Sequence, residues 1–163
     1  MKDEKETTDQ KVVIQAFFFE AMRAGYATEK SEKSRIRELP CYKVITYRNG
    51  NFYLVDMWCT HPNSNKSAGT TTIWFKDQSV WIMQYSGEYT ERAILVLKEA
   101  LRETYERNVF VGGRGNVTFQ KNRLLYDNKV TKNFFGDFEG QEVISDEGGR
   151  VQGYHDYRGM LLV

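Results

Sequence analysis

The stretch YRNGNFYLVD, residues 47–56, decides the fold, because its outline returns as FQKNRLLYDN at residues 119–128. In the first copy Asn49-Gly50 separates two strand-like runs, and this dipeptide is the strongest short-range signal for a β-hairpin with a type I′ turn. One unit is therefore predicted to occur twice. Further pairs recur 71 or 72 residues apart: Tyr47 and Phe119, Gly69 and Gly140, Val80 and Val151, Asp56 and Asn128, Tyr85 and Tyr157, Gly87 and Gly159.

Each hairpin is preceded by a helical pattern. The first helix is predicted over residues 9–25, where Val13, Phe17 and Ala21 recur at helical spacing. The second is predicted from Thr90, a favourable N-cap residue, to about residue 107. Four strands are then predicted in each copy. In the first copy they are residues 42–47, residues 52–58 and two strands around Asp77-Gln78-Ser79. In the second copy they are NVTFQ, RLLYDNKV, GQEVIS and RVQGYHDY.

These patterns predict a single α+β domain over residues 1–163, made of two helix-plus-four-strand repeats. Residues 1–8 are expected to be disordered, residues 9–88 to form the first repeat and residues 89–163 the second. A repeat that cannot cover its own apolar face packs on its neighbour, so a pseudo-twofold axis is expected to relate the two. The strands are expected to form a mostly antiparallel sheet with two main helices packed on it.

The composition argues against several classes of protein. Lys and Arg number 23 and Asp and Glu 22, so the formal net charge of +1 gives no basic signature and direct nucleic acid binding is not expected. No stretch approaches 18 apolar residues, and the charged start MKDEKETTDQ is not a signal peptide. Cys41 and Cys59 are predicted to be free thiols, since two cysteines without Cys-x-x-Cys spacing suit a reducing cytoplasm. No cofactor and no contact with a membrane are expected.

Four segments, NGNFYLVDMW, VWIMQYSG, FFGDFEGQEVI and YHDYRGMLL, resemble an uncharacterised bacterial family defined only as a domain of unknown function. The resemblance covers nearly the whole chain after Val12 and implies a similar fold in a bacterial cytoplasmic protein. The resemblance implies no catalytic residues, because none are established for that family. Some members follow a helix-turn-helix module, but no such segment is evident here. The chain departs from the family pattern at RIRELP, and only the second repeat keeps a Gly-x-Glu segment, at residues 140–142.

Asp56 is the first candidate for a functional residue. Alternation along a strand places it on one face with Phe52, Leu54 and Trp58, and its counterpart Asn128 occupies the same point in the second repeat. A carboxylate on an apolar face has a raised pKa unless a donor stabilises it, which is how general acids and bases arise. The alternative is that Asp56 is a structural polar anchor, which a duplicated position favours.

Aromatic residues supply the candidate ligand-binding surface. Tyr and Trp offer apolar area together with a polar tip, although most such residues belong to the core. If a cleft lies between the repeats, one strand face is expected to form its wall. The candidates are Trp58, Trp81, Met83, Tyr85 and Tyr157.

Acid and base chemistry has three further candidates in Glu142, His155 and the tyrosine at position 157. His155 and Asp156 are adjacent in a strand and point to opposite faces, so His155 is expected to work with Tyr157 instead. Metal binding is not expected, since Cys59 and His61 lack further ligands nearby. The segment VGGRGN follows a helix rather than preceding one, so it is interpreted as a helix end and strand entry, not a phosphate loop.

The second face of the first hairpin is apolar, with Tyr53, Val55 and Met57, and something must cover it. Either the first helix or a second copy of the chain, in a homodimer, fits this description. The leading functional hypothesis is a non-enzymatic small-molecule-binding or regulatory module. The alternatives are a small hydrolase or isomerase using Asp56 or Glu142 with His155 or a tyrosine, and a protein-interaction or structural domain.

Overall fold

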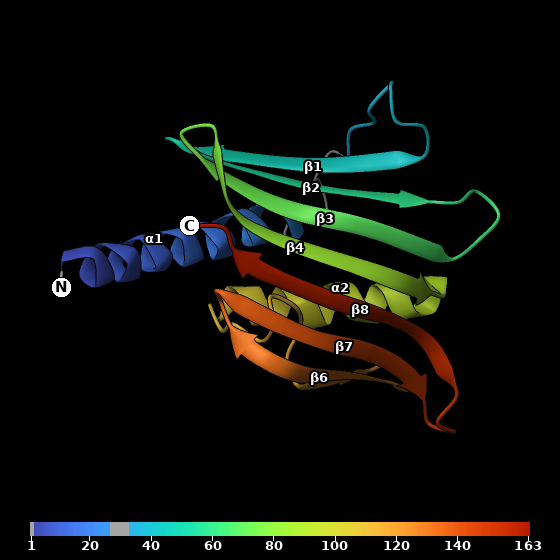
Figure 1. Ribbon diagram of the computed structural model, residues 1–163. Coiled ribbons are helices and arrows are strands. Elements are labelled where there is room, and N and C mark those ends of the chain that lie inside the picture. Colours follow the sequence, from blue (N-terminus) through green and yellow to red (C-terminus); the bar gives the residue numbers. More distant parts are fainter. Residues whose placement is uncertain (1, 27–32) are drawn as a thin grey trace.

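The computed structural model describes residues 2–26 and 33–163, with side chains described from Asp9 to Gly25 and from Lys33 onward, and it confirms the α+β class (Figure 1). The chain runs as helix, four strands, helix, four strands. The elements are α1 (Lys2–Tyr26), β1 (Tyr42–Asn49), β2 (Phe52–Thr60), β3 (Lys66–Phe75), β4 (Gln78–Tyr89), α2 (Glu91–Glu106), β5 (Thr118–Lys121), β6 (Leu124–Phe134), β7 (Asp137–Asp146) and β8 (Val151–Leu161).

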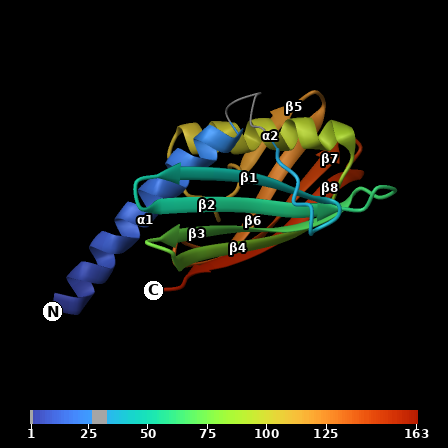
Figure 2. The ribbon, with the colours of Figure 1, turned by 90° about the horizontal axis from the view of Figure 1, so that it is seen from above.

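All eight strands form one antiparallel sheet in the order β1-β2-β3-β4-β8-β7-β6-β5. Each group of four consecutive strands is a meander, and β4 pairs with β8 where the two meanders meet. Both helices lie on one side of the sheet, and the N-terminal part of α1 projects past its edge (Figure 2). The face that carries the helices is called the inner face below.

The helix boundaries differ at one end from the prediction. α2 begins after Thr90, whose side-chain oxygen accepts a hydrogen bond from the amide of Ala93, as predicted for an N-cap. α1 begins at Lys2, so the predicted start at Asp9 after a disordered segment is too late. Residues 2–8 are polar and therefore show no apolar periodicity, which is the signal on which the prediction rested.

The hairpin turns also differ in detail. Asn49 pairs with Phe52, so the first turn is Gly50-Asn51, one residue later than predicted. Gly50 has a φ of 56°, but Asn51 is not left-handed, so the predicted type I′ turn is wrong there. In the second copy both turn residues, Asn122 and Arg123, are left-handed, as type I′ requires.

The core lies between the inner face and the two helices. Its centre is aromatic: the Trp81 ring stacks at 5.3 Å on Phe138 and lies 5.1 Å from Phe18 of α1. From α2, Ala93, Val96, Ala100 and Leu101 are buried on one side of the helix, as the amphipathic pattern requires. Burial of this apolar area holds the sheet and the helices together.

The loop from Arg107 to Val117, between α2 and β5, fills the space under the second meander. A side chain at Gly112 would meet the Tyr157 ring, and one at Gly115 would meet the Tyr126 ring. The loop carbonyls of Val111 and Gly115 accept hydrogen bonds from the side-chain amide of Asn128. The predicted role of these glycines as a helix end is wrong, since the left-handed residue after α2 is Asn108 and the glycines let the loop approach the sheet.

Candidate functional site

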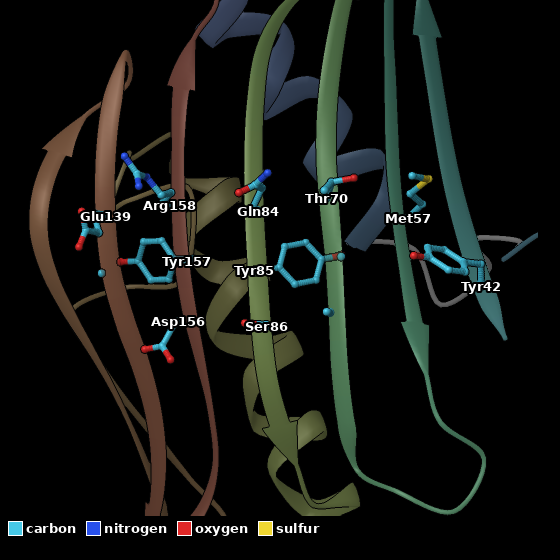
Figure 3. A pocket seen from close by; sticks show the side chains of 13 residues that line it. Tyr42, Met57, Thr70, Gln84, Tyr85, Ser86, Glu139, Asp156, Tyr157 and Arg158 are labelled. Atoms are coloured by element: carbon cyan, nitrogen blue, oxygen red, sulfur yellow. The ribbon is translucent and has the colours of Figure 1, made fainter. Parts of the chain in front are cut away.

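Three rows of residues cross the inner face and organise the polar groups. The central one, called the tyrosine row, is Gly69, Tyr85, Tyr157 and Gly140, four residues that are cross-strand partners in turn. The two rings point away from each other, Tyr85 over β3 and Tyr157 over β7, each above a glycine (Figure 3). A side chain at either glycine would collide with the ring, so glycine is required there.

Asp56 and Asn128 receive the two tyrosine hydroxyls. The Tyr85 hydroxyl donates to Asp56 at 2.7 Å, and the Tyr157 hydroxyl donates to the Asn128 side-chain oxygen at 2.6 Å. Asp56 is 1% exposed and accepts a second hydrogen bond from Thr71 at 2.9 Å. These contacts are those expected if Asp56 is a structural polar anchor, and no catalytic role is needed to explain them.

The row on one side of the tyrosines, called the methionine row, consists of Asp56, Thr71, Met83, Gly159 and Phe138. Met83 is fully buried, as is Trp81 two residues before it. Both side chains thus belong to the packed core rather than to the wall of a cleft, although Trp58 and Tyr85 do line a cavity.

The row on the other side, called the histidine row, consists of Ser67, Gly87, His155, Glu142 and Asn128. Gly87 lacks a side chain, and one built there would come within 2.8 Å of the His155 ring. The ring therefore crosses β4, and its Nε2 lies 3.1 Å from the Ser67 hydroxyl. On its other side, His155 Nδ1 lies 3.7 Å from a carboxylate oxygen of Glu142.

Glu142 is a fully buried carboxylate surrounded by donors. Arg114, from the loop after α2, forms a buried ion pair with it, and the hydroxyls of Tyr89 and Tyr126 each donate at 2.7 Å. Burial alone would raise the pKa of Glu142, but the charge and hydrogen bonds of Arg114 hold this pKa below its ordinary value. Glu142 is therefore ionised at neutral pH.

His155 is 5% exposed and lies beside this ion pair. Burial, together with the positive charge of Arg114, lowers the pKa of His155 to about 4, so its imidazole is neutral at physiological pH. Among the described residues, Nδ1 has no hydrogen-bond partner. As predicted, His155 and Asp156 lie on opposite faces, with Asp156 on the outer one.

One cavity, of about 580 Å³, reaches the histidine row from the surface; it is called the α2 cavity. It lies between α2 and the inner face of the first meander, in the half of the domain that the loop of residues 107–117 does not fill. Ser67, His155, Arg114, Tyr85 and Tyr89 are among its lining residues. Its apolar lining comes from both layers: Ile45, Trp58, Ile94, Leu95, Leu97 and Leu101.

Positive charge dominates the lining of the α2 cavity. Lys33, Lys43 and Lys98 lie close enough that partial burial and the charges of the other two lower the pKa of Lys33. Of the described lining residues, Glu99 is the one acid, and it is paired with Lys121 at 2.5 Å. Because like charges repel, such a cluster is stabilised when an anion binds there.

A second hollow, of about 610 Å³, lies on the outer face across the junction of β4 and β8, where a cleft between the repeats was predicted (Figure 3). It is a shallow groove lined by Thr70, Gln84, Ser86, Glu139 and Arg158 among others, with the two tyrosine rings below it. Tyr53, Val55 and Met57 are half-buried on this outer face, away from both helices. Their proposed homodimer contact stays a prediction.

The structure therefore gathers only part of the predicted site. His155, Tyr85 and Trp58 line the α2 cavity and Glu142 lies buried beside His155, whereas Asp56 and Tyr157 belong to the anchoring contacts below the outer groove. Ser67 and Arg114 are absent from the sequence-based candidates. Ser67 lies beside His155 because of the register of β3, β4 and β8, which the sequence does not reveal. Arg114 could have been noticed as a charged residue in a glycine-rich loop with apolar neighbours.

Comparison with known proteins gives a family without an assigned activity. Residues 60–161, from the end of β2 through β8, match the family model described as Domain of unknown function (DUF5680). The match includes α2, the loop with Arg114 and all five members of the histidine row. No curated protein and no solved structure matches the chain. Among the described residues, no helix has the length and apolar character needed to cross a membrane.

Proposed function

The chain belongs to the DUF5680 family, and from its geometry we propose that the domain binds a small organic anion in the α2 cavity. The observation that carries this proposal is the convergence of Lys33, Lys43 and Lys98 at a cavity where Glu99, the one acid among the lining residues that the structure describes, is already paired. A bound anion would relieve the repulsion among these lysines, and this gain in free energy favours binding.

The remaining lining indicates a ligand with an apolar part. Trp58, Ile45 and Leu97 provide apolar surface, and the Lys33 ammonium lies 5.5 Å from the Trp58 ring centroid. A cavity of about 580 Å³ is within the range typical of small-molecule sites. We therefore expect a carboxylate or phosphate attached to an aromatic or aliphatic group, in keeping with a ligand-binding or regulatory module.

We also infer that the domain arose from two copies of a half-domain related by a pseudo-twofold axis. The supporting observation is that Tyr85 and Tyr157 are direct cross-strand partners and each hydroxyl reaches the residue 29 positions earlier. In this interpretation the loop of residues 107–117 fills one half and leaves the matching volume in the other half as the binding cavity. The asymmetry between the copies is then what creates the site.

Titration calorimetry of the purified protein against benzoate, phenyl phosphate and neutral benzamide tests the binding proposal. We expect at least one of the two anions to bind, benzamide to bind more weakly, and added salt to weaken binding of the anion. Lys33→Ala and Lys98→Ala are expected to weaken anion binding several-fold each. Binding of benzamide as tightly as the anions, or of neither anion at millimolar concentration, would contradict the proposal.

Lys129→Ala is the matched control, since Lys129 is an exposed lysine on β6, far from the α2 cavity in the sheet order. It removes the same charge from the protein without touching the cavity. An equal loss of affinity in Lys129→Ala and Lys98→Ala would mean that net charge, rather than the cavity, attracts the anion.

A further inference from the structure

The α2 cavity is lined by a hydroxyl and an imidazole, and a buried carboxylate lies behind the imidazole. The Ser67 hydroxyl lies 3.1 Å from His155 Nε2, and His155 Nδ1 lies 3.7 Å from Glu142. Ser67 is half-buried and lines the cavity, so an incoming molecule can reach its oxygen. A nucleophile beside a base, with the base held by a third group, is the arrangement that activates serine for attack on acyl groups.

Glu142 decides which nitrogen of His155 carries the proton. A deprotonated Nδ1 would direct its lone pair at a carboxylate oxygen 3.7 Å away, which is a repulsive arrangement. The neutral ring is therefore expected to carry its proton on Nδ1, facing Glu142. Nε2 is then unprotonated, and it accepts the hydrogen of the Ser67 hydroxyl.

We propose that Ser67 is a nucleophile and His155 its general base in the hydrolysis of a small carboxylic ester that carries an anionic group, with Glu142 as the positioning residue. This inference rests on the proposed function, because the lysines at the α2 cavity would hold the anionic group of the ester. Lys33, Lys98 and Arg114 line the same cavity as Ser67, so its lining carries positive charge, which favours a developing oxyanion.

The reaction balances with water as the only co-reactant. The Ser67 oxygen attacks the ester carbonyl carbon while its proton passes to His155 Nε2. The C–O bond of the ester then breaks, and the leaving alcohol takes that proton. Water attacks the acyl-serine, giving its proton to Nε2, and the Ser67 oxygen recovers the proton as the carboxylic acid departs. His155 is neutral before each attack, as burial and Arg114 require.

A fluorophosphonate ester tests the nucleophile directly, because it reacts with an activated serine and needs no anionic group. We expect a covalent adduct on Ser67, identified by peptide mass spectrometry, and no adduct in Ser67→Ala. Ser86→Ala is the matched control: Ser86 is an exposed serine on the outer face of β4 and its loss is expected to leave the reaction unchanged. Absence of an adduct on Ser67 in the folded protein would overturn the proposal.

Steady-state hydrolysis of two esters separates this proposal from the binding proposal. The substrates are the anionic 4-nitrophenyl half-ester of succinic acid and neutral 4-nitrophenyl butyrate. Ser67→Ala and His155→Gln are expected to lower kcat for both esters by roughly 100-fold or more. Lys98→Ala is expected to raise KM for the anionic ester only. An adduct on Ser67 with no preference for the anionic ester would overturn the anion proposal alone, whereas anion binding with unchanged hydrolysis in Ser67→Ala would overturn the nucleophile proposal alone.

Nitrogen chemical shifts of the His155 ring test the positioning role of Glu142. In the folded protein at pH 7 we expect the neutral tautomer with the proton on Nδ1, and in Glu142→Gln we expect that preference to be lost. A folded wild-type protein with the proton on Nε2 would overturn the assignment of His155 as the base for Ser67, whatever the stability of the variant.

Discussion

The histidine row and the methionine row cross the same face of one sheet, and on β4 each lies two residues from Tyr85. The repeat spacing matches positions of the two rows, and the matched side chains differ in chemistry. Glu142 corresponds to Thr71, 71 residues earlier, and His155 corresponds to Met83, 72 residues earlier. These four side chains are all buried. The difference therefore does not come from exposure to water but from what packs against each row.

The loop with Arg114 explains that difference. A buried carboxylate needs a partner of opposite charge and satisfied hydrogen bonds, and Arg114, Tyr89 and Tyr126 supply these to Glu142. The methionine row meets the aromatic side chains of the core instead, such as Trp81 beside Phe138. The Asp56 carboxyl at the end of the methionine row is bound by the hydroxyls of Tyr85 and Thr71, whereas Glu142 lies where the chain returns with a charged partner.

Glu142→Gln set against Thr71→Val is the strongest test of this contrast. The glutamine leaves the buried Arg114 guanidinium without its counter-charge, which costs about 3 to 5 kcal/mol. Thr71→Val removes one hydroxyl hydrogen bond to Asp56 and should cost about 1 to 2 kcal/mol. Urea unfolding at pH 7 measures both free energies, and a Glu142→Gln loss no larger than that of Thr71→Val would remove the distinction between the rows.

Acid should destabilise the protein through His155. Its pKa is about 4 when folded and near 6.5 when unfolded, so between these values the unfolded chain binds more protons and stability falls as pH is lowered. The expected loss between pH 7 and pH 5 is about 2 kcal/mol, with none of this effect well above pH 6.5. Arg114 from the loop, Glu142 from β7 and Tyr89 from β4 surround the ring.

His155→Met places at position 155 the residue type that Met83 supplies in the methionine row, and this variant is the control for the pH effect. The variant should lose this part of the pH dependence and keep that of Glu142. The lowered pKa of Glu142 contributes stability that is present above the ordinary pKa of a glutamate and is lost as pH falls through the lowered value. Free energies of unfolding at pH 7, 6 and 5 measure the difference. An identical pH profile in the variant would show that His155 is not the group responsible.

The smallest expected difference concerns the tyrosine row, which the two halves share. Tyr85→Phe removes a hydrogen bond to the Asp56 carboxyl group and should cost about 2 kcal/mol, while Tyr157→Phe removes one to the Asn128 amide and should cost about 1 kcal/mol. Tyr53→Phe on the outer face is the control and should change stability by less than about 0.5 kcal/mol. A larger loss for Tyr157→Phe than for Tyr85→Phe would reverse the expected order.

Much of the fold was predictable because local signals agree with it. The cap at Thr90, the hairpin signal at Asn49-Gly50 and the burial of Leu54 and Asp56 on one face of β2 each depend on a few neighbouring residues. The start of α1 was missed because residues 2–8 are polar in sequence and give no apolar periodicity from which a helix could be predicted. The sequence predicted a mostly antiparallel sheet, but the strand order, with β4 beside β8, was not predicted, because no local signal marks which distant strands pair.

The site was harder to predict because register and loop path decide it. His155 and Glu142 were candidates separately, yet only the pairing of β7 with β8 places them side by side. Ser67 lies two strands away, and the glycine at position 87 lets the ring reach it. Arg114 was not among the candidates because the glycines around it were interpreted as a helix end and strand entry. In the structure these glycines let the loop approach the sheet, so that the Arg114 guanidinium lies in the core.

The junction of β4 and β8 also has a consequence for how the protein folds. Each meander consists of neighbours in the chain, which pair quickly because little loop entropy is lost. β4 and β8 are joined only after a long stretch of chain has been synthesised, and Ser67 and His155 are 88 residues apart. Because β8 follows Ser67 by so long a stretch, a growing polypeptide cannot possess the Ser67–His155 contact until β8 has been synthesised and docks beside β4, and truncation before His155 would abolish that contact while leaving the strands of the first meander in the chain.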